Sequence, residues 1–150
     1  MRFACLALAL LTLPARAGDA WVTGTIASYH FDRSVGYNEF NPGLGAQYRF
    51  DGHWRAGLGF YKNSFSRTSW YAVGGYFTDP VARVFGTEVR PGLYAGGASG
   101  YRTASPVTPA ALGALSFQRG RYDVTILGIP KIDHKTSGLV TLQFAMRFSP

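Results

Sequence analysis

The hydrophobic residues of this chain recur at every second position over most of its length. In segment 138–148 the even positions from Val140 to Phe148 are all apolar, and the odd positions between them are polar, small or charged. Because successive residues of a β-strand point to opposite faces, this pattern predicts a strand with one apolar and one polar side. The apolar side is unbroken over these even positions, which favours a strand that faces lipid over a strand of a soluble sandwich.

Seven earlier segments have strand patterns of roughly the 9–11 residues that a tilted membrane strand needs. The alternation is clear in 54–63, where Trp54, Ala56, Leu58 and Phe60 occupy one side. We therefore predict an all-β fold, an eight-stranded antiparallel transmembrane β-barrel with up-and-down meander topology. The strands are expected at 20–31, 43–50, 54–63, 69–78, 84–100, 110–118, 121–129 and 138–148.

The connections between these strands alternate in length, which predicts the orientation of the barrel. Short turns are expected at 51–53, 79–83 and 119–120, and longer polar loops at 32–42, 64–68, 101–109 and 130–137. In membrane barrels of this kind the short turns face the periplasm and the longer loops face outward.

The N-terminal segment has the pattern of a secretory signal peptide. Arg2 is followed by the apolar run 3–11 and by Ala15-Arg16-Ala17, a small-x-small cleavage pattern. We expect a signal peptide at 1–17 and an outer-membrane barrel at 18–150, located in the bacterial outer membrane. No later segment has the ~18 consecutive apolar residues that a membrane-spanning helix requires.

Charge and composition add two expectations. The formal net charge is +7, and basic residues predominate in the predicted outer loops, which would suit the phosphates of lipopolysaccharide or would simply form a solvated rim. Six charged residues are expected to face inward, to pair and to fill mainly the periplasmic half of the lumen, because buried charges need partners: Arg49, Arg55, Glu88, Arg90, Asp123 and Arg147. We expect a monomer and no nucleic-acid partner.

The candidate chemistry lies at the outer mouth of the predicted barrel. His30 ends the first strand on the side opposite Tyr29 and Phe31, so its side chain should face the lumen, and Ser64 follows the third strand. A histidine beside a hydroxyl can take its proton for acyl transfer, although both residue types are also ordinary at a rim. The sequence contains no metal-ligand spacing and no phosphate-binding glycine loop, and we expect no cofactor.

Several segments, in their order along the chain, resemble the PagP-type lipid A palmitoyltransferases of the outer membrane. The resemblance extends over roughly 24–148, and no single motif in it is decisive. The segments are YNEFNPGLG at 37–45, GLGFYKNSF at 57–65, VGGY at 73–76, SPVTP at 105–109, GIP at 128–130 and LQFAMRF at 142–148.

The resemblance implies an eight-stranded barrel whose lumen holds one acyl chain. The family uses a histidine near the end of its first strand and an Asp-Ser pair after its third. The serine corresponds to Ser64, Asn63 stands at the aspartate position, and His30 is the nearest histidine. Gly75 corresponds to a small residue at the floor of the acyl pocket. Prolines near the outer rim, such as Pro42 and Pro130, imply openings in the wall, because proline lacks the N–H of a ladder.

The leading hypothesis is an acyltransferase that moves a palmitoyl-like chain from a phospholipid to lipid A. His30 would be the general base or acid, Ser64 its hydroxyl partner, and Asn63 would adjoin them. The residues expected at the substrate are Glu39, Tyr61, Gly75 and Arg67. One alternative is a non-enzymatic small barrel that is structural or binds ligands. Another is a lipid A deacylase, whose active residues would face lipid instead of the lumen.

Overall fold

The structure, a computed structural model, describes residues 18–101, 105–130 and 138–148. The predicted signal peptide at 1–17 and parts of two predicted outer loops, 102–104 and 131–137, lie outside the described residues. Nothing in the described part of the chain is a helix long and apolar enough to cross a membrane.

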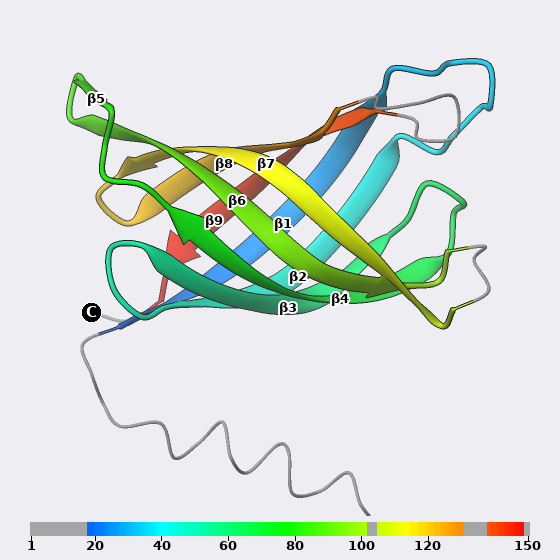
Figure 1. Cartoon of the computed structure of the whole chain (residues 1–150), viewed down its shortest axis with the longest axis horizontal. Coiled ribbons are helices and arrows are strands. Elements are labelled where there is room, and N and C mark those ends of the chain that lie inside the picture. The colour runs from blue at the N-terminus through cyan, green and yellow to red at the C-terminus, as the bar shows by residue number, and fades with distance from the viewer. Residues whose placement is uncertain (1–17, 102–104, 131–137, 149–150) are drawn as a thin grey trace, which may run out of the picture.

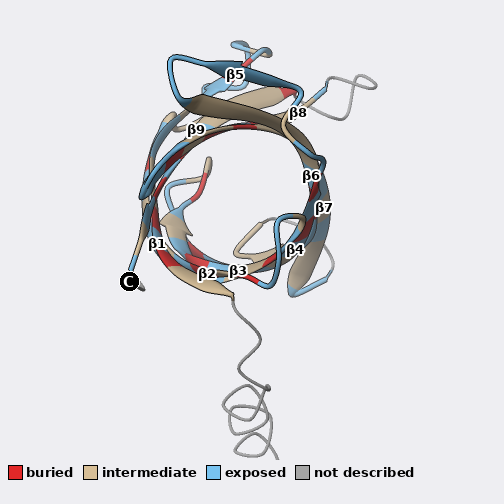
Figure 2. Ribbon diagram, turned by 90° about the vertical axis from the view of Figure 1, so that its left-hand side faces the viewer, coloured by how far each residue is buried: buried red, intermediate tan, exposed pale blue. Residues whose placement is uncertain are grey.

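The described strands close into an antiparallel barrel (Figures 1 and 2). Strands that are neighbours in sequence pair from β1 to β4 and from β5 to β9, and β1 pairs with β9 to close the ring. β4 pairs with β6, and the short extra strand β5 pairs with the beginning of β6. The predicted eight-stranded meander is therefore confirmed. The strands are β1 (Asp19–His30), β2 (Phe40–Arg49), β3 (Trp54–Lys62), β4 (Thr68–Phe77), β5 (Ala82–Val84), β6 (Thr87–Ser99), β7 (Val107–Arg119), β8 (Tyr122–Ile129) and β9 (Leu139–Arg147).

The connection after β4 differs from the predicted turn at 79–83. Instead of a turn, the chain forms a β-hairpin in which Val84 pairs with Thr87 and the residues between them, Phe85 and Gly86, both have positive φ angles. Two such residues make the tight turn that suits a two-residue hairpin. The sequence Asp79-Pro80 indicated the first turn. The second turn, at Phe85-Gly86, was not predicted because phenylalanine is not a typical turn residue.

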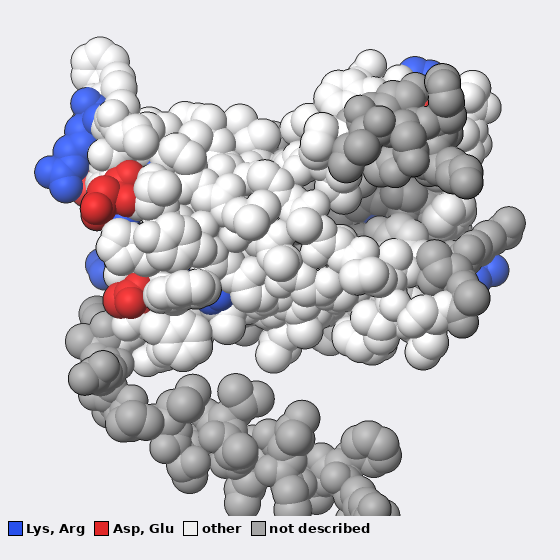
Figure 3. All heavy atoms as spheres, viewed as in Figure 1, with Lys and Arg blue, Asp and Glu red and all other residues white. Residues whose placement is uncertain are grey.

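The outward residues form an apolar surface with aromatic residues toward both ends. Leu44, Leu58 and Leu142 are between 42% and 59% exposed and lie on this outer surface. Exposed aromatic side chains flank this apolar band: Phe50, Trp54, Tyr76 and Tyr122 toward the short-turn end, and Tyr29, Phe31, Phe40 and Trp70 toward the long-loop end. Charged side chains gather at the ends of the barrel, and the middle of the visible face is largely uncharged (Figure 3). This surface is the one that a bilayer covers.

A charged network crosses the lumen in the short-turn half. Asp123, which is 1% exposed, accepts bonds from Arg49 at 2.7 Å, Arg55 at 3.4 Å and the Ser116 hydroxyl at 2.8 Å. The Thr125 hydroxyl donates to its other oxygen at 2.9 Å. The predicted pairing of the inward charges is confirmed, with two guanidinium groups sharing one carboxylate.

On the inner face of the long-loop half, two glycines leave room for the side chain of Tyr71. Gly45 and Gly59 have no side chain to collide with Tyr71, so the Tyr71 ring lies flat along the wall over both of them. A Cβ on either glycine would collide with that ring. Below this region, Phe77, Tyr94 and Leu127 form a buried apolar cluster that separates it from the charged network.

We predict that Asp123→Asn destabilises the barrel by about 3–5 kcal/mol, because it leaves two buried guanidinium groups without their counter-charge. Urea unfolding from lipid vesicles measures the effect, and Asp79→Asn, at a carboxylate that is 88% exposed, is the matched control. A loss for Asp123→Asn no larger than that for the control would contradict the assigned role of the network.

Candidate active site

A β-bulge in β1 decides which side of the wall His30 faces. Up to Thr25 the odd residues of β1 point inward, as the burial of Trp21 and Thr23 shows. The pairing of β1 then shifts register with both β2 and β9 between Thr25 and Ser28. The bulge reverses the parity of the strand, so the even-numbered His30 is buried at 3% exposure while Ile26 is 55% exposed.

His30 and Ser64 meet at the long-loop mouth of the lumen. The Ser64 Oγ lies 2.9 Å from the His30 Nε2, within hydrogen-bond distance, although 34 residues separate them in sequence. If the hydroxyl donates this bond, the ring carries its proton on Nδ1. Both the inward orientation and the proximity predicted from the sequence are confirmed. The pair has the geometry of a general base beside a hydroxyl nucleophile.

Glu39 and Tyr37 complete the surroundings of the imidazole. The Tyr37 ring stacks on the His30 ring with centroids 4.6 Å apart. The Glu39 Oε1 lies 4.0 Å from the His30 Nδ1, which is buried and has no hydrogen-bond partner among the described residues. The same carboxylate accepts a bond from the His30 backbone N–H and one at 2.8 Å from Arg33. Glu39 thus lies beside the imidazole as well as at the rim.

These two contacts hold Glu39 in its ionised form. The His30 backbone N–H is the main cause, and with the Arg33 guanidinium it keeps the pKa of the Glu39 carboxyl below its usual value. The stabilisation from these contacts is therefore present above the ordinary carboxyl pKa and is lost as the pH falls through the lowered one.

Asn63 holds the loop that carries Ser64. Its side-chain oxygen accepts bonds from the backbone N–H groups of Phe65 and Arg67, at 2.9 and 3.1 Å. Its nitrogen donates to the Ser69 hydroxyl and to the Gly100 carbonyl, at 2.9 and 3.0 Å. Asn63 is completely buried. We therefore treat it as a positioning residue and not as a group that touches the reacting atoms.

The first loop is bonded directly to the Ser64 loop. The Asn38 backbone N–H donates to the Ser64 carbonyl at 2.9 Å, and the Asn38 side chain donates to the Asn63 carbonyl at 3.2 Å. The buried Asn41 donates to the Asn38 and Lys62 carbonyls and accepts a bond from the Ser28 hydroxyl. These bonds fix His30 and Ser64 relative to each other.

The structure places the other expected site residues at different depths. The Tyr61 hydroxyl bonds to the Tyr101 hydroxyl at 2.6 Å inside the mouth, and Arg67 is exposed in the Ser64 loop. Gly75 faces inward, but the Tyr94 ring occupies the space in front of it, where a Cβ would approach to 2.5 Å. At this depth of the lumen the inner surface is therefore formed by the Tyr94 ring. The ring can take this position because Gly75 has no side chain.

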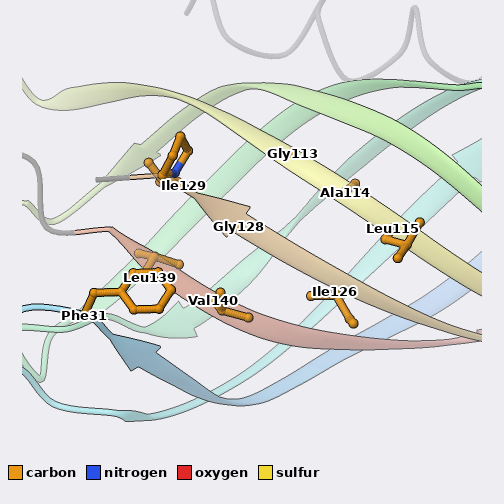
Figure 4. Close-up of a pocket in the computed structure, with 10 residues that line it drawn as sticks. Phe31, Gly113, Ala114, Leu115, Ile126, Gly128, Ile129, Leu139 and Val140 are labelled. Atoms are coloured by element: carbon orange, nitrogen blue, oxygen red, sulfur yellow. The ribbon is translucent and has the colours of Figure 1, made fainter. Parts of the chain in front are cut away.

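The wall has an apolar groove near His30. β7 pairs with β6 from Val107 onward, but among the described residues its pairing with β8 begins only at Gly113. A depression of about 380 Å³ lies at the start of this ladder, over residues that are paired, with lining from β7, β8, β9 and Phe31 (Figure 4). Leu139 lines it and is the register partner of His30 in the sheet. We call this depression the wall groove.

Sequence reasoning missed the roles of Tyr37, Asn38 and Asn41. All three belong to the segment 37–45 that carried the family resemblance, but neither stacking nor loop bonding can be read from their spacing.

In the described part of the chain, no group of three or more His, Cys, Asp or Glu side chains is placed to hold a metal ion.

Comparison with known proteins shows the fold alone. No protein-family model and no curated protein sequence matches this chain. A solved structure that matches is the solution NMR structure of the de novo designed TMB2.3, a transmembrane β-barrel, with a TM-score of 0.62 and 16% sequence identity. The match covers 92% of this chain and 100% of that chain. Together with the apolar outer surface, it shows that this chain is an eight-stranded transmembrane β-barrel.

We predict that Asn63→Asp destabilises the barrel by about 1–3 kcal/mol, because it removes the amide donors to Ser69 and Gly100 and leaves buried acceptors unsatisfied. Thermal unfolding in detergent measures this, with Arg67→Gln in the same loop as the control. An Asn63→Asp variant as stable as the control would show that the amide network does not hold the loop.

Proposed function

We propose that this barrel is an outer-membrane acyltransferase that moves a palmitoyl-like chain from a phospholipid to lipid A. The observation that carries the proposal is the pair formed by the buried His30 and the half-buried Ser64, with Nε2 and Oγ 2.9 Å apart at the mouth of the lumen. The resemblance to the PagP-type family supplies the two substrates, and the geometry supplies a base, a hydroxyl and an adjacent carboxylate.

The proposed reaction has two acyl transfers. His30 Nε2 takes the proton of Ser64 as Oγ attacks the ester carbonyl of the phospholipid, and the lysophospholipid leaves with that proton. A hydroxyl of lipid A then loses its proton to His30 and attacks the acyl-serine ester, and His30 gives that proton to Ser64 Oγ as it leaves, which returns both residues to their starting forms. A movement of Glu39 by about 1 Å would bring it within hydrogen-bond distance of Nδ1–H, where it would stabilise the imidazolium.

Access for an acyl chain is supported by the wall groove and by the inner face behind it. The groove opens on the lipid-facing surface, and its lining is almost wholly apolar. Inside the barrel the Tyr71 side chain lies over Gly45 and Gly59, and the apolar cluster of Phe77, Tyr94 and Leu127 lies below it. An acyl chain held against such surfaces would exclude water, which favours transfer over hydrolysis.

The acceptor would bind at the rim. Arg67 is exposed beside Ser64, and guanidinium groups bind phosphate through several hydrogen bonds at once. We therefore assign the phosphates of lipid A to this side of the mouth. The inward orientation of His30 distinguishes the proposal from a deacylase whose active residues face lipid.

Mass spectrometry of lipid A, after expression in a host that lacks its own palmitoyltransferase, tests the proposal. We expect one additional acyl chain with the natural sequence. Ser64→Ala and His30→Gln should each reduce that product at least about 100-fold, as expected when one member of a base–nucleophile pair is removed.

Ser66→Gly is the matched control, because it removes a hydroxyl from the same loop at a position whose φ of 60° suits glycine. It should leave the product unchanged. Released fatty acid without transferred chain would indicate a deacylase instead. No new lipid A species from a folded barrel would leave the non-enzymatic alternative in place.

A further inference from the structure

The β5–β6 hairpin projects beyond the barrel at the short-turn end. It consists of β5, the turn at Phe85-Gly86 and the first residues of β6. Figure 1 shows it extending past the other turns at that end, and the view along the axis in Figure 2 places it outside the ring of strands. All three residues of β5 are exposed. The hairpin therefore leans toward the side where lipid surrounds the barrel.

The two faces of this hairpin differ in polarity. Directly paired residues share a face, and Ala82 pairs with Val89, which belongs to the outward parity of β6 that continues to Leu93. Val84 lies on this same face. The opposite face carries Arg83 and Glu88, which form an ion pair at 2.7 Å. The apolar face is thus continuous with the lipid-facing surface of the barrel.

Phe85 at the tip adds an independent observation. Its φ is 50°, a conformation that bulky residues rarely adopt and that glycine or asparagine would adopt more easily. Its side chain is nevertheless 91% exposed, so the rest of the chain offers almost no contact in return. An unfavourable backbone that keeps an aromatic ring in the open indicates that the ring is used outside the folded chain.

Basic side chains lie around the tip. The Arg119 Nε is 3.9 Å from the position that a Cβ on Gly86 would occupy, so this side chain reaches the turn. Arg83 is 72% exposed, and Arg121 is exposed in the neighbouring turn. Arginine beside an exposed aromatic ring matches the boundary of a bilayer, where anionic headgroups meet the acyl chains.

We propose that the β5–β6 hairpin binds the anionic phospholipid surface of the leaflet at the short-turn end, with Phe85 inserted among the lipids and the arginines on the phosphates. The site is separate from the His30–Ser64 pair and does not depend on acyl transfer. It gives the barrel a contact with the leaflet beyond its own wall.

An environment-sensitive dye on the hairpin tip tests this proposal. Phe85→Cys in a Cys5→Ser background is labelled with nitrobenzoxadiazole and folded, as the full chain, into vesicles of phosphatidylcholine with phosphatidylglycerol. We expect emission at shorter wavelength than from the same dye on Asp79→Cys, an exposed position in the same connection, and stronger quenching by brominated lipid. Replacing Arg83 and Arg119 by glutamine should reduce that difference most in vesicles that contain phosphatidylglycerol.

Two results would overturn the proposal. The first is emission from the tip that equals that of the Asp79→Cys control and is quenched by aqueous iodide to the same extent. The second is an emission shift that appears only at high protein-to-lipid ratio, which would identify a second copy of the chain as the occupant. Val84→Cys on the apolar face reads the same surface should the Phe85 variant fail to fold.

Discussion

The bulge in β1 is the feature on which the candidate site depends. A strand in a closed barrel has one side toward lipid and one toward the lumen, and without an extra residue His30 would continue the outward parity of Val22. The bulge is held by its neighbours: the Thr141 hydroxyl donates to the Ala27 carbonyl at 2.8 Å, and the Thr25 hydroxyl to the Asn41 carbonyl at 2.9 Å. A buried imidazole can then meet a serine on another loop.

The lumen divides into two parts with different roles. In the short-turn half, Asp123 binds two arginines, and the Arg55 guanidinium also lies 3.6 Å from the centre of the Phe77 ring. These contacts join strands from different sides of the lumen at that end. In the long-loop half, glycines allow Tyr71 to lie along the wall, and the ladder between β7 and β8 is shorter than the strands themselves. Under the proposed function, the charged end would support the end that holds the acyl chain.

The two-residue alternation was sufficient to predict the eight barrel strands, because lipid on one side imposes it on every strand. It failed at the β5–β6 hairpin, where Phe85 gives no turn signal. The bulge was not predicted, because it lies at Ile26 and Ala27 and no glycine or proline marks it there. The inward orientation of His30 was predicted only from its outward neighbours Tyr29 and Phe31. The role of Asn63 could not be predicted either, because its partner Gly100 is remote in sequence and is brought close only by the barrel.

The proposed function requires that the bulge place a reactive serine–histidine pair inside the mouth. Intact-protein mass spectrometry after treatment with a long-chain alkyl fluorophosphonate tests this claim most directly, because such a reagent labels only an activated hydroxyl. We predict a single adduct on Ser64 that is lost when His30 is replaced and also when Ala27 is deleted to remove the bulge. A barrel that folds but forms no adduct, or that retains the Ser64 adduct after Ala27 is deleted, would contradict the account.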